Sequence, residues 1–167
     1  MNDKKMNIHT ISMLVANKPG VLVRVALVFA RRGYNIDSLV VSPSFDERYS
    51  RMTITAQGDP AILEQIIKQT AKLVDVIHSG EHTEAEALHR ELALVKIKNV
   101  TANHSIVTKF IKKFNSAVID QDEKALIVQL VGTTAELDEM EVFLKKYGMM
   151  EIVRSGKLVM VKGTQET

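Results

Sequence analysis

The residues best suited to chemistry stand in one turn, Asn17-Lys18-Pro19-Gly20, directly ahead of the apolar run Val21–Ala30. If that run is a helix, its first backbone N–H groups lack intrahelical acceptors and carry partial positive charge, which attracts anions. Gly20 has no Cβ, so a carboxylate could approach these amides closely, and Pro19 stiffens the turn without adding a donor. The turn therefore suits a carboxylate ligand, although Pro-Gly is also one of the commonest plain turns.

A second candidate set, for a metal, is His82, Glu86 and His89, which would align if their segment were helical. A solvated polar segment explains the same residues more simply, because nothing nearby would orient them as ligands. The sequence also lacks Gly-x-Ser-x-Gly, Gly-x-Gly-x-x-Gly, a phosphate loop, His-Glu-x-x-His and any cysteine. We therefore expect no catalytic residues, no metal site and no cofactor bound by this chain itself.

The run Val21–Ala30 contains one charged residue, Arg24, so a helix there has no side that clearly prefers water. Its 10 residues span roughly 15 Å, half a bilayer core, which is too short to cross a membrane. One side can pack on the chain's own sheet. We expect the other side to meet a second copy or a partner, since small domains rarely leave so much apolar surface exposed.

The composition is that of an ordinary globular protein of one domain or two small ones: 167 residues, 46% apolar and 25% charged. The net charge of +2 is dispersed along the chain, which argues against a surface that tracks nucleic-acid phosphates. The start MNDKKMNIHT has neither an apolar signal region nor an Arg- and Ser-rich transit pattern. Together with the lack of cysteine, this predicts a cytoplasmic protein.

Hydrophobic periodicity and turn residues predict strands alternating with helices. The expected strands are His9–Ala16, Ile36–Val41, Arg51–Ala56, Val74–Ser79, Leu92–Ile97, Ala117–Asp120, Ala125–Val131, Glu151–Arg154 and Leu158–Val161, and the expected helices are Val21–Ala30, Pro60–Lys72, Asn103–Phe114 and Thr134–Tyr147. The order strand, helix, strand, strand, helix, strand is that of the ferredoxin-like fold, and it occurs twice. We predict an α+β protein of two tandem ferredoxin-like βαββαβ modules, residues 1–80 and 91–167, joined by a linker, residues 81–90.

RNA-binding modules share this fold and stack bases on aromatic residues of their central strands. Here Phe29, Phe110, Phe114 and Phe143 all fall on expected helices, and the strand Arg51–Ala56 has no aromatic residue. Nucleic acid is therefore not an expected partner.

Several blocks of residues together resemble one family. They include Asn17–Leu22 with Arg24, Arg32–Leu39, Ser50–Thr53, Lys72–Val74, Arg90–Lys96, Val118–Asp120 and Glu151–Gly156. The chain is similar over almost its whole length to the regulatory (small) subunits of acetohydroxyacid synthase, also called acetolactate synthase. The first block alone would indicate only an ACT domain.

The resemblance implies an N-terminal ACT domain that binds a branched-chain amino acid, usually valine, and a C-terminal ferredoxin-like domain. It implies a non-catalytic homodimer that associates with a large catalytic subunit, raises its activity and confers feedback inhibition. Thiamine diphosphate, FAD and Mg would belong to the large subunit. An alternative from another class is a free-standing amino-acid sensor or transcriptional co-regulator built on an ACT domain, and only the partner would distinguish the two.

The resemblance also assigns an effector site, shared between a loop of one subunit and a strand start of its neighbour. The loop is Asn17, Lys18, Pro19, Gly20, Val21 and Leu22, and the neighbour's residues are Asn35 and Ile36. Amides from Gly20 to Leu22 would hold the carboxylate, the two Asn side chains the polar head, and Leu22 with Ile36 the apolar chain. Alternatively, Asn17 only stabilises its turn and Asn35 only begins a strand.

Overall fold

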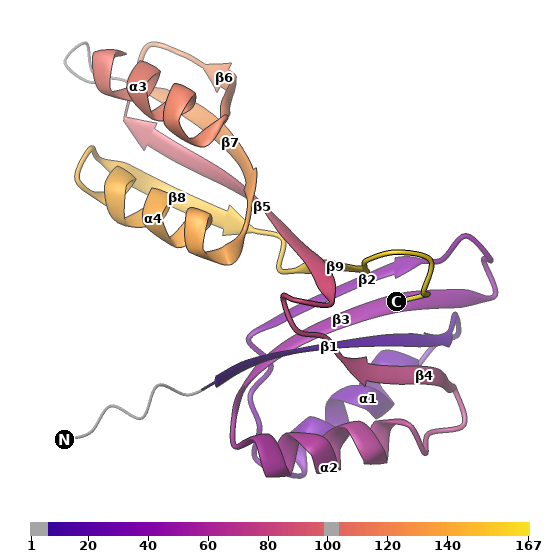
Figure 1. Ribbon diagram of the computed structural model, residues 1–167. Coiled ribbons are helices and arrows are strands. Elements are labelled where there is room, and N and C mark those ends of the chain that lie inside the picture. The colour runs from indigo at the N-terminus through magenta and orange to yellow at the C-terminus, as the bar shows by residue number, and fades with distance from the viewer. Residues whose placement is uncertain (1–6, 99–103) are drawn as a thin grey trace, which may run out of the picture. The chain divides into compact units, whose positions relative to one another are not determined.

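Each half of the chain folds as strand, helix, two strands, helix and strand, in the order that the sequence predicts (Figure 1). The computed structural model describes residues 7–98 and 104–167. The first half comprises β1 (Asn7–Ala16), α1 (Val21–Ala30), β2 (Ser38–Pro43), β3 (Tyr49–Gly58), α2 (Pro60–Thr70) and β4 (Val76–Glu81). The second comprises β5 (Ala87–Lys98), α3 (His104–Phe114), β6 (Ala117–Gln121), β7 (Ala125–Gly132), α4 (Thr134–Lys145) and β8 (Met149–Arg154), and β9 (Leu158–Val161) follows.

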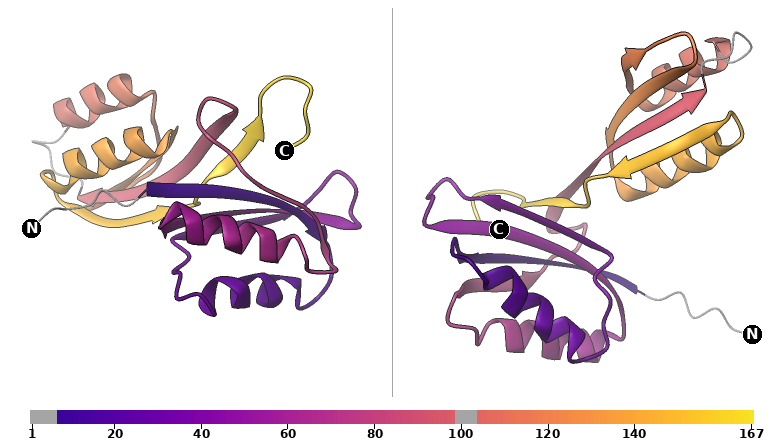
Figure 2. Two further views of the ribbon diagram at one scale, coloured as in Figure 1. Left: turned by 60° about the horizontal axis from the view of Figure 1, so that its bottom comes forward. Right: turned by 180° about the vertical axis from the view of Figure 1, so that it is seen from behind.

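In the first half, the antiparallel sheet has the order β2-β3-β1-β4, and α1 and α2 both lie on one of its faces (Figure 2). Alternate residues of β1, namely Ile11, Met13 and Val15, are buried on that face, as the two-residue period of a strand requires. They pack with Val25 and Phe29 of α1 in one hydrophobic core.

The second half repeats this arrangement with the sheet order β6-β7-β5-β8. Its core joins alternate residues of β5 and β7 to α3 and α4. The ring of Phe110 lies 4.8 Å from that of Phe114 and 5.4 Å from that of Phe143, all three on helices. The predicted fold class, two ferredoxin-like modules in tandem, is thus confirmed.

The observed units differ from the predicted ranges at the linker and at the C-terminal end. The first unit extends to His89 and includes Lys157–Thr167, and the second is Arg90–Gly156. Strand β5 begins at Ala87, inside the expected linker, because buried and exposed residues alternate along its whole length. The segment after β9 returns to the first unit, where the Lys162 N–H donates to the Glu86 carbonyl over 3.0 Å. No pattern among neighbouring residues predicts this pairing, because Lys162 and Glu86 are far apart along the chain. Asn103, the predicted start of α3, lies outside the described residues.

Candidate functional site

Gly20 is the N-cap of α1 and adopts φ +83°, a left-handed conformation that favours glycine. No side chain caps this helix, and its first turn contains no acidic residue. In contrast, side chains cap the N-termini of α2 and α4. Asp59 accepts a hydrogen bond from the Ala61 N–H over 2.8 Å at α2, and Thr133 forms a capping box at α4. Apart from the Val21 N–H, which donates to the Lys18 carbonyl over 3.5 Å, the amides at the start of α1 are therefore open to an anion from outside the chain.

Two neighbouring loops hold this turn in place. The Asn17 N–H donates to the Arg48 carbonyl over 2.8 Å, and its side-chain amide donates to the Glu47 carbonyl over 2.9 Å. On the other side, Arg24 forms an ion pair of 2.5 Å with Asp75. The Asn17 side chain thus stabilises the turn, as the simpler interpretation has it, and its oxygen is the part left for a ligand. Sequence reasoning missed Asp75 and the β2–β3 turn, because they lie far from Gly20 along the chain.

The remaining loop residues differ in exposure. Lys18, Pro19 and Gly20 are exposed, and Leu22 is 42% exposed. Val21 is buried in the core of its own module, so only its backbone can face a ligand. Asn17 to Gly20 and Leu22 are thus exposed at the start of α1, and Val21 contributes only its backbone there.

Asn35 and Ile36 lie elsewhere in the same chain, beyond the C-terminal end of α1. The 10 residues of α1 span about 15 Å, so one copy of the chain does not bring Asn35 to the Gly20 turn. Asn35 is exposed and lies within 3.5 Å of the Asp37 carboxylate, and Ile36 is half-buried against its own core. The two predicted halves of the site could meet only between two copies.

Helix α1 has one apolar side in the core and another outside it. Val21, Val25 and Phe29 are buried, whereas the exposed fractions of Leu22, Val23 and Leu27 are 42%, 60% and 45%. The sequence predicted a helix with two apolar sides, and the structure identifies which residues form each. We call Leu22, Val23 and Leu27 the outer apolar side of α1.

Two of the three residues considered for a metal site, His82 and Glu86, form hydrogen bonds with other residues. His82 Nε2 shares a hydrogen bond of 2.6 Å with the Ser12 hydroxyl, and the Glu86 carboxylate accepts from the Thr83 hydroxyl over 2.8 Å. Burial lowers the pKa of His82 and of His89, which favours the neutral form of each imidazole. Within residues 7–98 and 104–167, no three His, Asp or Glu residues are arranged to hold a metal ion. None of the described helices is long and apolar enough to span a membrane.

Comparison with known proteins gives a match for each module. Residues 11–78 match a family model described as an AHAS small subunit-like ACT domain, and residues 90–163 match the model for the small subunit of acetolactate synthase. The chain belongs to the family of acetolactate synthase small subunits. The chain covers more than nine tenths of the length of the relatives described next.

A probable acetolactate synthase small subunit of Archaeoglobus fulgidus is 37% identical over 95% of this chain and 99% of its own. The acetolactate synthase small subunit of Mycobacterium bovis is 39% identical over 93% of this chain and 92% of its own. The crystal structure of the Thermotoga maritima small subunit superposes with a TM-score of 0.85 at 32% identity, covering 96% of this chain and all of that one. The family's small-subunit fold therefore accounts for both modules.

Proposed function

We propose that this chain is the regulatory subunit of an acetolactate synthase, which activates a large thiamine-diphosphate-dependent subunit and confers feedback inhibition by a branched-chain amino acid. Family membership over both modules supports a large catalytic subunit as partner. The effector is expected to be valine or a close analogue. The chain itself contributes no catalytic residues and no cofactor in this proposal.

In this proposal, the effector carboxylate binds at the N-terminus of α1. The observation that supports this site is that no side chain caps that N-terminus. Gly20 has no side chain to cap the amides, and Leu22 offers apolar surface beside them. The bonds from Asn17 and Arg24 to neighbouring loops hold the turn in one conformation before the ligand arrives. Preorganisation of this kind lowers the entropic cost of binding.

The homodimer forms through the outer apolar side of α1. A two-fold arrangement buries the same residues of both copies, and it is the arrangement that lets Asn35 and Ile36 of a second copy approach the Gly20 turn. Effector binding and dimerisation are then linked, so that loosening one weakens the other by the same free energy, about 1–3 kcal/mol in allosteric systems.

The test is an inhibition curve for valine, leucine and isoleucine on the enzyme reconstituted with Gly20→Asp or Gly20→Asn. The two variants match in size, and both residue types tolerate positive φ better than most. The Asp carboxylate repels the effector's carboxylate, so Gly20→Asp should abolish inhibition but keep activation, whereas Gly20→Asn should weaken inhibition only partly.

Unchanged inhibition with Gly20→Asp would place the effector elsewhere. Synthesis of acetolactate by the small chain alone, or no activation of the large subunit by the wild-type chain, would refute the regulatory role itself.

A further inference from the structure

A cavity of about 530 Å³ lies within the first unit, on the side of its sheet opposite α1 and α2. Residues of β1, β3 and β9 line it, together with residues of the β2–β3 turn and of the segment after β9. Figures 1 and 2 show that segment beside the face of the sheet opposite α1 and α2. Residues that line it include Leu14, Tyr49, Arg51, Met160, Val161 and Glu166. Leu14 and Arg51 are opposite each other in the β1–β3 ladder, so both project from the helix-free face. This cavity is separate from the Gly20 turn.

Arg51 lacks an acceptor for its charge. Its Nη1 atom is buried without a hydrogen-bond partner, and no ion pair among the described residues includes Arg51. Burying part of a guanidinium without an acceptor costs free energy, so such groups are normally paired. The acidic side chains that line the cavity are those of Asp46, which binds Arg48 in a 2.5 Å ion pair, and Glu166. Arg51 itself lines the cavity, so an anion bound there would supply a counter-ion that the described residues do not.

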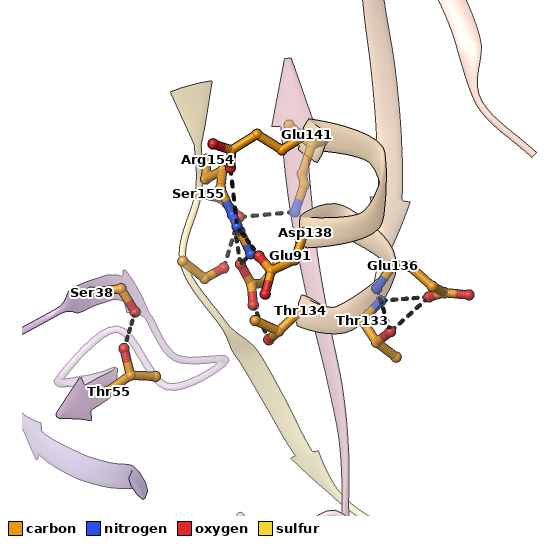
Figure 3. A network of polar contacts seen from close by, with 12 residues as sticks. Ser38, Thr55, Glu91, Thr133, Thr134, Glu136, Asp138, Glu141, Arg154 and Ser155 are labelled. Atoms are coloured by element: carbon orange, nitrogen blue, oxygen red, sulfur yellow. Dashed lines mark hydrogen bonds and ion pairs between the residues drawn. The ribbon is translucent and has the colours of Figure 1, made fainter. Parts of the chain in front are cut away.

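Figure 3 shows the ion pairs of Arg154, a partly buried arginine of the second module. Arg154 Nη2 donates to Glu91 over 2.8 Å and Nη1 donates to Asp138 over 2.6 Å. This guanidinium is held by the chain's own carboxylates. The comparison indicates that the unpaired state of Arg51 is a property of its cavity and not of arginines in this fold.

We propose that the cavity binds a small carboxylate with an apolar chain, with Arg51 as the residue that binds the anion. Leu14, Met160 and Val161 provide the apolar wall that such a chain needs. Glu166 lines the same cavity and forms no ion pair among the described residues, so it could accept the ammonium group of an amino acid. Carboxylates with and without that ammonium share the chemistry that Arg51 recognises.

The experiment is calorimetric titration of the full chain carrying Gly20→Asp, which removes the proposed effector site but leaves the cavity intact. The probes are valine, 3-methyl-2-oxobutanoate, which lacks the ammonium, and isobutylamine, which lacks the carboxylate. Both carboxylates should bind saturably, and isobutylamine should not. If valine binds more tightly than the oxo acid, its ammonium group contributes to binding, as an ion pair with Glu166 requires. If the two bind equally, Arg51 makes the only ionic contact with the ligand.

Adding Arg51→Gln to Gly20→Asp should weaken carboxylate binding at least tenfold, whereas Arg51→Lys, which keeps the charge, should lose less. Because Arg51 forms no ion pair among the described residues, Arg51→Gln should leave the ligand-free unfolding midpoint unchanged or raise it. Valine should then raise the midpoint only in the chain that retains Arg51.

Any of three results overturns the proposal. They are no saturable binding of either carboxylate to the Gly20→Asp chain, binding undiminished by Arg51→Gln, and binding of isobutylamine equal to that of valine. A large drop in the ligand-free midpoint with Arg51→Gln would equally show that Arg51 has a structural role.

Discussion

The two modules share one order of elements but differ in how they satisfy their polar groups. In the second module, the N-terminus of α4 is closed by the Thr133–Glu136 capping box, and Arg154 is bonded to two carboxylates. In the first module, α1 begins at the uncapped Gly20, and Arg51 has no acceptor among the described residues. Among the described residues, the second module thus pairs its α4 N-terminus and Arg154 within the chain, whereas the first module leaves the N-terminus of α1 and Arg51 without such partners.

The first helices of the modules differ in the same way on their outer sides. Helix α3 presents Lys109, Lys112 and Lys113 to solvent, and Lys113 pairs with Glu139 over 2.6 Å. Helix α1 presents its outer apolar side instead. A helix face made of lysines is stable in water by itself, whereas an apolar helix face is stabilised when a partner covers it. The module with the uncapped α1 is thus also the module with an exposed apolar helix side, and it is the one that we propose forms the dimer.

The largest effect is expected from charges placed on the two sides of α1. Val25 is fully buried, so Val25→Asp should cost more than about 4 kcal/mol and unfold the first module. Leu27→Lys makes α1 resemble α3 and should leave the fold intact. It should weaken the dimer about 100-fold, because each copy loses an apolar contact worth about 1.5 kcal/mol.

Circular dichroism measures the fold and sedimentation equilibrium measures the dimer in both variants. A wild-type chain that sediments as a monomer at micromolar concentration, or a Leu27→Lys dimer as tight as the wild type, would remove the proposed role of the outer apolar side.

The two arginines provide the next test. Arg154→Met leaves the Glu91 carboxylate, which is 6% exposed, without its counter-ion, and should cost about 3 kcal/mol. Arg51→Met removes a charge that has no counter-ion in the described part of the chain, so its effect on stability should be neutral or slightly favourable. Native-state hydrogen exchange of β7 and β3 amides reports each module separately. Equal losses in both modules would mean that Arg51 is satisfied in a way that its geometry does not reveal.

The smallest expected difference is in the response to pH. Burial lowers the pKa of His82 and His89 below the ordinary value of 6.5, so the unfolded chain takes up protons more readily than the folded one. Stability of the first module should therefore fall as the pH drops from 6.5 toward the folded pKa values. In the second module, hydrogen bonds from backbone N–H groups lower the pKa of Asp122 and Glu136, and that contribution is lost only below about pH 4.5.

Unfolding of the wild type and of His82→Asn at pH 7.5 and 5.5, with hydrogen exchange to assign the modules, checks this difference. The variant should lose part of the pH dependence of the first module. A second module that weakens as much as the first over this interval would contradict the assignment to the two histidines.

The order of helices and strands was predictable because the signals are local. The Pro60 start of α2 after a capping Asp59, the alternation along β3 and the apolar run of α1 each depend on a few neighbouring residues. The turn Asn17–Gly20 was recognisable for the same reason, since Pro-Gly before a helix leaves its amides uncapped. Membership of the family rests on residues alone and was also within reach of the sequence.

Tertiary structure alone decided which apolar residues of α1 face the core, because a helix that is apolar almost all round does not identify its buried side. Only the tertiary structure also shows that Lys157–Thr167 belong to the first unit, and that Arg51 lines a cavity with no hydrogen-bond acceptor for its Nη1 atom among the described residues. These facts depend on strand register and on contacts between residues distant in the chain. Spacing along a sequence carries no information on which distant carboxylate is within reach of a guanidinium.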